Sequence, residues 1–389
     1  MPTTPFKNIL YRMALLLRAP KLEKQPDLRV SGNRLYTRSA YIRLLRRHHV
    51  LGSAALIKDQ ERRVLLFCDS HHPTHIVNEH KMFRVASITK MAAALAALRA
   101  VEESRLRLDA PVLTYFPEVS SLPALQDVTL RQLLSHTAGL LDPPDLEPAL
   151  IQGKPFPEIM GQARIAAPGQ EFHYSNLGFG LVGSLLEAVY QAPVSLILKQ
   201  LVFDPLEMRA TLEASSLSRE EIVPITRVLP YHPEKDLLVT PLGERPLDSS
   251  APLLHYGYTA GAMYLDLPSL EKLMDCLARY GKPLLKSELG RTMTRPHASY
   301  GSASPTLTYG LGLLRIQDPS ISHATILGHQ GFAYGCADGA FWEEGTGRMI
   351  LFLNGGASEA RRGRLGLCNE DILKWALRKE MPQWSGSAK

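Results

Sequence analysis

The chain has 389 residues, 45% of them hydrophobic, so it can bury a large core as one big domain or as two lobes. No low-complexity tract or repeat of fixed period is visible, which argues against a solenoid or a propeller. The formal net charge is +6, but residues 1–50 hold 11 Lys and Arg against 2 Asp and Glu. The remaining chain, with 33 basic and 36 acidic residues, is slightly acidic, so the basicity belongs to an N-terminal arm.

Residues 1–26 form this arm and its linker. Helical spacing places six apolar residues on one face: Phe6, Ile9, Leu10, Met13, Leu16 and Leu17. Lys7, Arg12 and Arg18 lie off that face, and the longest uninterrupted apolar run, MALLL, is too short to cross a membrane. Three interpretations stay open: residues 1–20 make peripheral membrane contact, the apolar face docks on the protein itself, or the arm is a poor export signal. Without a convincing signal peptide, a cytoplasmic or membrane-associated location is favoured, and an extracytoplasmic one is left open.

Beyond the arm, apolar spacing predicts a helix over 38–49 and a β-hairpin with strands 52–57 and 63–68. A short strand over 83–85 leads into a helix over 87–102. Further helices are expected after Thr129, a plausible N-cap, and over 176–190, 194–203 and 269–281. Residues 211–250 are polar, rich in proline and not assigned. In the last third, short β-like runs predict strands in TYGLGLLRI, HATILGH, ADGAFWEE and RMILFLNGG, and a closing helix is expected in NEDILKWALRKEM.

This order predicts an α+β fold, in which strands from both ends of the sequence form one antiparallel sheet flanked by helices, with an inserted all-helical lobe. We expect one domain over 27–389, with an α/β lobe from 38–86 and 255–385 and a helical lobe over 87–254. The cleft between two such lobes is a natural position for a functional site.

Ser87 and Lys90, in FRVASITK, are the first candidate site residues. Unpaired N–H groups and the helix dipole favour negative charge at a helix N-terminus, and Lys90 lies one turn further on the same face. A buried amine with a lowered pKa can take the proton of a serine hydroxyl and make it a nucleophile. The spacing alone has low specificity, because SLEK at 269–272 repeats it.

Tyr174 and Asn176, in YSN, lie where a Pro-Gly turn and an extended segment meet a helix. A phenol beside an ammonium can relay protons, and an amide can bind both a lysine and a substrate amide. The alternative is a tyrosine packed on the core and an asparagine that starts the next helix. The third motif is His329-Gln330-Gly331, placed at the start of a β-like run; HxG also occurs at 255–257.

SITK at a helix start, YSN 87 residues later and HQG another 155 residues on resemble, in this order, the serine β-lactamase and penicillin-binding superfamily. The resemblance is to the class C β-lactamase and D-alanyl-D-alanine carboxypeptidase branch, with its esterase and D-aminopeptidase relatives. It extends over about 40–380 through segments that look like the family: LRLDAPVLTYFP, VTLRQLLSHTAGL, PGQEFHYSNLGFGLVG, YGLGL and LGHQGFAYG. It places SLEK on a helix after a Gly-rich turn and the HxG at 255–257 too early to be the third motif.

The resemblance implies a β-lactamase/transpeptidase-like fold and a role for each motif. Ser87 would form an acyl-enzyme, and Lys90 and Tyr174 would share general acid and base work, with the division left open. Asn176 would orient Lys90 and the substrate amide. The backbone N–H groups of Ser87 and Phe332 would form the oxyanion hole.

His329 and Gly331 would complete the substrate-binding residues, Gly331 leaving room for the substrate backbone. His329 stands where many β-lactamases have lysine, and an imidazole holds a carboxylate less firmly than an ammonium. The sequence therefore favours the esterase and peptidase-like branches over an efficient β-lactamase.

The leading hypothesis is a serine hydrolase acting on an amide, a D-amino-acid peptide, a β-lactam or an ester. The alternative is a penicillin-binding-like sensor or scaffold of the same fold without turnover. The expected partner is a small-molecule or peptide substrate. No nucleic-acid partner is expected, because the basic arm has few interleaved aromatic residues.

The remaining histidines and cysteines are assigned structural roles. His136 is expected to fix a loop by hydrogen bonding. The histidines of 71–80 lack an acidic or cysteine partner at ligand spacing, so neither a metal nor another cofactor is expected. The cysteines form no CxxC pair and are expected to be free buried thiols: Cys68, Cys276, Cys336 and Cys368.

Overall fold

The structure is a computed structural model of the whole chain. It describes the following residues: 5–18, 28–31, 34–60, 62–69, 76–116, 122–154, 156–161, 163–228, 254–300, 306–333 and 335–377. The histidines at 71, 72 and 75 and most of the unassigned segment 211–250 lie outside these residues.

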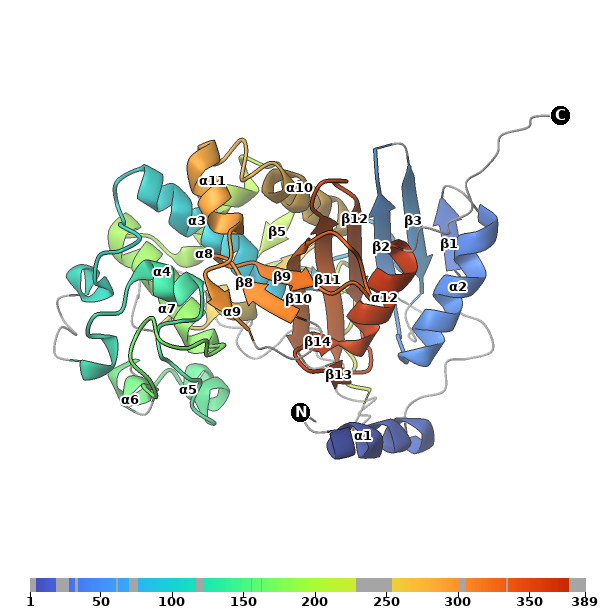
Figure 1. Cartoon of the computed structure of the whole chain (residues 1–389), viewed down its shortest axis with the longest axis horizontal. Coiled ribbons are helices and arrows are strands. Elements are labelled where there is room, and N and C mark those ends of the chain that lie inside the picture. The colour runs from blue at the N-terminus through green and yellow to red at the C-terminus, as the bar shows by residue number, and fades with distance from the viewer. Residues whose placement is uncertain are drawn as a thin grey trace.

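A nine-stranded antiparallel sheet organises the described residues (Figure 1). Its order is β1-β3-β2-β12-β11-β10-β9-β8-β7. Three strands come from the start of the chain: β1 (Leu28–Ser31), β2 (Ser53–Lys58) and β3 (Arg63–Cys68). Six come from its last third: β7 (Ala298–Ser299), β8 (Thr306–Tyr309), β9 (Leu314–Gln317), β10 (Ile326–Ala333), β11 (Cys336–Glu343) and β12 (Met349–Asn354). The two groups meet where β2 pairs with β12, with Leu56 opposite Leu351, as the predicted α+β sheet requires.

Alternation along the strands divides the core between the two faces of the sheet. On β12, Ile350 and Phe352 pack with α2 (Arg34–Arg47) and α12 (Leu367–Leu377), whose Tyr41 and Trp375 rings lie 5.3 Å apart. Leu351 and the alternate side chains of β12 that point the same way face the opposite side of the sheet. There they join a second cluster of buried hydrophobic residues, which includes residues of α10 (Leu267–Ala278) and of the helical region. The sheet is therefore covered on both faces, and its helices come from both ends of the chain.

The middle of the chain folds mainly as helices packed around α3 (Thr89–Glu102), of which only three of fourteen residues are not buried. The others are α4 (Leu130–Leu134), α5 (Leu146–Gln152), α6 (Phe156–Met160), α7 (Asn176–Tyr190), α8 (Val194–Leu198), α9 (Tyr258–Gly261) and α11 (Ser287–Thr294). A helix buried on all sides belongs to the interior of a large domain. The described residues contain no single helix long and apolar enough to cross a membrane; only α7 and the 194–203 segment, bent by 88°, meet that test together.

Most predicted elements are present, with three local differences. The helix expected over 194–203 ends as α8 at Leu198 and continues as a π-helical turn, Lys199–Phe203. Residues 210–211 form β5 (Ala210–Thr211), which joins β4 (Phe83–Arg84) and β6 (Tyr264–Leu265) in a small second sheet. The third motif is not at the start of its strand, because β10 already begins at Ile326.

Thr129 caps α4 with a reciprocal capping box, as its position predicts. The four cysteines are buried free thiols, also as predicted. The lobe boundaries inferred from the sequence stay a prediction.

Candidate active site

The segment before α3 holds Ser87 in a fixed, strained turn. Ser87 lies in a 3₁₀ turn, Ala86–Ile88, and the preceding Ala86 has a φ of +43°, a left-handed conformation that is costly for a residue with a side chain. The Thr89 hydroxyl donates to the Ala86 carbonyl at 2.6 Å and accepts from the Met263 N–H at 3.1 Å. These contacts tie the turn to Met263, the residue before β6, at the start of a long buried helix.

Lys90 is fully buried one turn further along, and its amine is in contact with Ser87. Nζ lies 3.0 Å from Ser87 Oγ, 2.9 Å from Asn176 Oδ1 and 2.7 Å from the Ala260 carbonyl. Burial lowers the pKa of Lys90 to about 7, although the Asp142 carboxylate partly opposes this shift. A neutral amine has two N–H groups for the two carbonyl oxygens and one lone pair for the Ser87 hydroxyl. The geometry therefore fits a lysine that receives the Ser87 proton.

Asp142 fixes the asparagine that contacts Lys90. Its carboxylate accepts from Asn176 Nδ2 at 2.8 Å, from Ser175 Oγ at 2.9 Å and from the Leu177 N–H at 2.9 Å. Because the amide nitrogen of Asn176 is held by Asp142, its Oδ1 faces Lys90. Asp142 was not among the predicted site residues, because no motif distinguishes it in LLDPPD and its contacts with the start of α7 depend on the fold.

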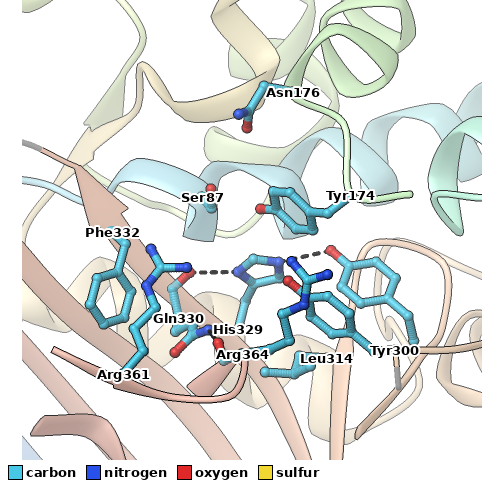
Figure 2. Close-up of a pocket in the computed structure, with 11 residues that line it drawn as sticks. Ser87, Tyr174, Asn176, Tyr300, Leu314, His329, Gln330, Phe332, Arg361 and Arg364 are labelled. Carbon is cyan, nitrogen blue, oxygen red and sulfur yellow. Dashed lines mark hydrogen bonds between the residues drawn. The ribbon is translucent and has the colours of Figure 1, made fainter. Parts of the chain in front are cut away.

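The Tyr174 phenol is directed at Ser87, as Figure 2 shows. Burial and then the neighbouring Tyr300 raise the pKa of Tyr174 well above its usual value. The Lys90 amine lies 5.0 Å from the centre of the Tyr174 ring. Tyr174 stays protonated near neutral pH.

His136 holds the segment that carries Tyr174, as the sequence analysis expected. Its Nδ1 accepts from the Ser175 N–H at 3.1 Å, its carbonyl accepts from the His173 N–H, and its ring packs 4.2 Å from that of Tyr174. Burial lowers the pKa of His136 well below its usual value, so it is neutral. His136 acts on the loop and does not reach the pocket lining.

His329 lines the pocket, but both of its ring nitrogens have partners within the protein. Nε2 lies 2.8 Å from the Tyr309 hydroxyl, and Nδ1 lies 2.7 Å from the Gln330 carbonyl. Since a carbonyl can only accept, Nδ1 carries the proton and Nε2 accepts from Tyr309. Burial, and then Lys90, lower the pKa of His329 to about 3. His329 therefore presents a neutral ring to the pocket and no cation.

Gly331 and Phe332 place β10 directly beside the turn that holds Ser87. A Cβ at Gly331 would come within 2.4 Å of the Val85 carbonyl oxygen, so only glycine fits this approach. Phe332 lines the same pocket as Ser87, and its ring packs under the Arg361 guanidinium at 4.5 Å. All seven site residues predicted from the sequence thus lie in or against one region.

The pocket between these residues has a volume of about 300 Å³. Its described lining includes two arginines and no acidic residue; Arg361 and Arg364 extend from the segment before α12 toward Ser87 and Tyr174 (Figure 2). Arg364 also lies over the Tyr300 ring at 5.3 Å. Tyr300, Tyr309 and these arginines were not among the predicted site residues, because no local pattern distinguishes them from ordinary core and surface residues.

The second copies of the motifs, SLEK at 269–272 and HxG at 255–257, make structural contacts outside this pocket. Ser269 Oγ accepts from the Arg209 N–H at 2.7 Å, and Lys272 Nζ donates to the Glu207 carbonyl at 2.6 Å, so these two side chains serve different contacts. His255 pairs with the buried Glu187 at 2.8 Å. Among the described residues, no cluster of His, Cys, Asp and Glu could hold a metal ion.

Comparisons with known proteins place the chain in a family. The family model described as Beta-lactamase matches residues 38–363. Esterase EstB of Burkholderia gladioli is 28% identical over 339 residues, which cover 76% of this chain and 83% of the esterase.

Two solved structures are similar in fold. The D-amino acid amidase of Ochrobactrum anthropi SV3 superposes with a TM-score of 0.64 at 22% identity, covering 84% of this chain and 95% of the amidase. A penicillin binding protein from Bacillus halodurans has the same TM-score, 0.64, at 20% identity, covering 88% of this chain and 98% of that protein.

Proposed function

The chain belongs to the beta-lactamase family and has its β-lactamase/transpeptidase-like fold, and from this premise we propose that it is a serine hydrolase that forms an acyl-enzyme on Ser87. The observation that carries the proposal is the contact of 3.0 Å between Ser87 Oγ and the buried Lys90 amine, whose pKa is lowered to about 7. Near neutral pH a large fraction of Lys90 is then a free base, as nucleophilic catalysis by serine requires.

In the proposed reaction, Lys90 takes the Ser87 proton as Oγ attacks the substrate carbonyl. The backbone N–H groups of Ser87 and Phe332 stabilise the oxyanion, and the bond to the leaving group then breaks. Tyr174, which keeps its proton because its pKa is raised, is the donor to the leaving group. The proton that Lys90 took from Ser87 then replaces the one that Tyr174 gave up, so that both groups return to their starting forms. Water next attacks the acyl-Ser87 ester and its proton passes to Lys90. Lys90 returns this proton to Ser87 Oγ as the ester bond breaks, which releases the acid and restores the serine.

We further propose that esters are the preferred substrates. His329 is neutral and both of its nitrogens are occupied, so this position gives no ammonium to hold the carboxylate of a β-lactam. The similarity to esterase EstB supports the same preference.

The two arginines in the pocket favour acyl groups that carry a negative charge at their far end. Arg361 and Arg364 lie across the pocket from Asn176 and bring two guanidinium groups to its lining. A guanidinium can bind a carboxylate through two parallel hydrogen bonds. Changing Arg364 to Gln should raise KM for an anionic ester and leave KM for a neutral ester of equal length almost unchanged; an equal effect on both esters would contradict this preference.

A panel of three substrates tests the proposed activity: a short nitrophenyl ester, a D-alanine nitroanilide and a chromogenic cephalosporin. We expect the ester to be hydrolysed fastest and the cephalosporin slowest. Lys90→Met should lower kcat for the ester by about 100-fold or more, as loss of a general base does, whereas Lys272→Met, which alters the lysine of the SLEK motif, should not.

The proposal fails if none of the three substrates is turned over by the folded protein. Stable acylation of Ser87 without product release would instead support the sensor hypothesis, which time-resolved intact-mass spectra would reveal.

A further inference from the structure

Helix α1 (Pro5–Arg18) lies against the outside of the body, below β13 (Arg361–Arg362) in the view of Figure 1. It docks through one face. Leu15 is buried against Leu51 and Val228, and the Tyr11 hydroxyl accepts from the Glu359 N–H at 3.1 Å. The helix therefore has a defined orientation on the protein.

The apolar face predicted from the sequence points the other way. Ile9, Leu10, Met13 and Leu17 are 56, 49, 55 and 82% exposed. They are four of the ten large hydrophobic residues that are exposed in the described part of the chain, and all four lie on this one helix. Of the three interpretations left open by the sequence, docking of this face on the protein itself does not hold for these four residues, because Tyr11 and Leu15, on the opposite side of the helix, make that contact. An apolar stripe of this size on a soluble surface marks an interaction site.

The charge of the arm identifies the kind of partner. Residues 5–18 contain three basic residues and no acidic one, and residues 1–50 carry 11 basic residues against 2 acidic ones. Two such helices facing each other in a dimer would bring like charges together, whereas an anionic surface would complement them. At 14 residues the helix is about 21 Å long, too short to span a bilayer but sufficient to lie along its surface.

We propose that α1 attaches the protein to the surface of an anionic lipid bilayer. The helix lies in the plane of the interface with Ile9, Leu10, Met13 and Leu17 at the boundary between head groups and acyl chains. Tyr11 and Leu15 keep the helix fixed to the body, so that the catalytic domain is held next to the membrane. This inference is independent of the proposed hydrolase activity.

Flotation of the purified full chain with lipid vesicles tests the proposal. We expect the protein to float with vesicles of phosphatidylcholine and phosphatidylglycerol and much less with phosphatidylcholine alone, because the attraction requires anionic lipid. The combined variant Ile9→Gln, Leu10→Gln, Met13→Gln and Leu17→Gln should reduce flotation by about tenfold or more. Its melting temperature should match that of the wild type, since these side chains are exposed in the fold.

The matched control changes exposed apolar residues on the body, Ile165→Gln and Leu196→Gln, and should float like the wild type. Equal flotation of the wild type and the α1 variant would overturn the proposal, as would a wild type that fails to float with anionic vesicles. A concentration-dependent dimer that the α1 variant abolishes, without flotation, would assign the face to a second copy and also overturn it.

Discussion

At the scale of single residues, the proposed chemistry of the site depends on the protonation state of the Lys90 amine. Burial lowers its pKa to about 7, while burial raises the pKa of Tyr174 and lowers that of His329 to about 3. Of these three groups, only Lys90 changes its charge near neutral pH. These pKa directions support the proposed assignment, which the sequence left open, of Lys90 as the base and Tyr174 as the proton donor.

The first prediction concerns the pH dependence of the rate. Lys90 acts in its neutral form, so kcat/KM for a neutral ester should be low when Lys90 is protonated, rise as the pH passes about 7, and level off above it. Steady-state kinetics across neutrality measures this profile. A rate that is independent of pH in this range, or that falls as pH rises, would contradict the assignment of Lys90 as the base.

The second prediction tests Asp142 as a positioning residue. Asp142→Asn removes the anionic acceptor for Asn176, Ser175 and Leu177, and loss of hydrogen bonds to a charged group costs about 1.5–3 kcal/mol each, so kcat/KM should fall at least tenfold. Because the Asp142 charge raises the pKa of Lys90, the rising limb of the pH profile should also move to lower pH.

The control is Asp145→Asn, three residues further on, where the exposed carboxylate pairs only loosely with Lys154 at 3.6 Å. Asp145→Asn should leave unchanged both the plateau value of kcat/KM and the pH at which kcat/KM rises. A lower plateau for Asp142→Asn with no movement of the limb would show a merely structural role.

Residues in the motifs were predictable, and residues that support them were not. Ser87 and Lys90 are recognisable because their spacing along one helix brings them together locally. Asp142, Tyr309 and Arg364 reach the site through loops and strands far away in the sequence, and none has a local pattern that distinguishes it. His329 was predicted as a substrate-binding residue. The hydrogen bonds that occupy both of its ring nitrogens, with Tyr309 and Gln330, depend on contacts that only the fold supplies.

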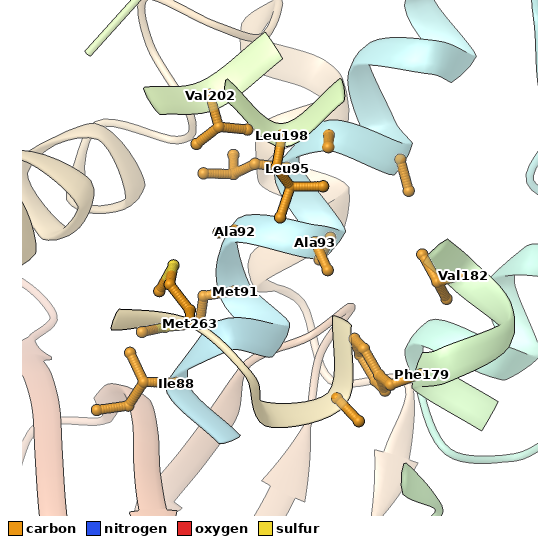
Figure 3. Close-up of a cluster of buried hydrophobic side chains, with 14 of the residues drawn as sticks. Ile88, Met91, Ala92, Ala93, Leu95, Phe179, Val182, Leu198, Val202 and Met263 are labelled. Carbon is orange, nitrogen blue, oxygen red and sulfur yellow. The ribbon is translucent and has the colours of Figure 1, made fainter. Parts of the chain in front are cut away.

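At the scale of elements, two packed segments hold Ser87: α3 behind it and β10 beside it. Figure 3 shows Met91, Ala92 and Leu95 of α3 among side chains from several neighbouring segments, including Phe179, Leu198 and Met263. Because α3 is buried almost all round, its first turn cannot shift without disturbing the core. On the other side, β10 approaches the Ser87 turn at Gly331 with no space for a side chain.

The third prediction concerns this approach. Gly331→Ala would place a Cβ within 2.4 Å of the Val85 carbonyl oxygen, so β10 or the Ser87 turn must move. Overpacking of this kind costs about 1–3 kcal/mol, and we expect a lower melting temperature together with a loss of kcat that exceeds the loss of folded protein. Thermal unfolding and ester hydrolysis measure the two effects.

Gly161→Ala is the matched control, because a Cβ there meets nothing closer than 3.9 Å. It should change neither the melting temperature nor kcat. A Gly331→Ala protein with wild-type kcat would show that this close approach does not position Ser87.

The predicted helices and strands match the structure where the hydrophobic periodicity of the sequence is simple. The hairpin of β2 and β3 and helix α7 lie close to their predicted positions. The helix predicted over 194–203 gives way to a π-helical turn, in which Leu201, Val202 and Phe203 are buried in succession. A pattern based on 3.6 residues per turn cannot predict such a turn.

At the scale of the whole molecule, the pocket is formed by distant parts of the chain: the start of α3, the start of α7, β10 and the segment before α12. The sequence predicted that strands from both ends of the chain share one sheet, because the alternation of apolar and polar residues and the order of the motifs can be recognised in the sequence. It did not predict which face of α1 contacts the body. That choice depends on Leu51 and Val228, which lie far from the helix in sequence.

The central claim is that Ser87 is the residue that becomes acylated. Intact-mass spectrometry after reaction with a fluorophosphonate tests it most directly. We predict that the wild type gains the mass of one phosphonyl group, that Ser269→Ala, which alters the serine of the SLEK motif, gains the same mass, and that folded Ser87→Ala gains none. An unlabelled wild type, or a Ser87→Ala variant labelled as fully as the wild type, would contradict the account.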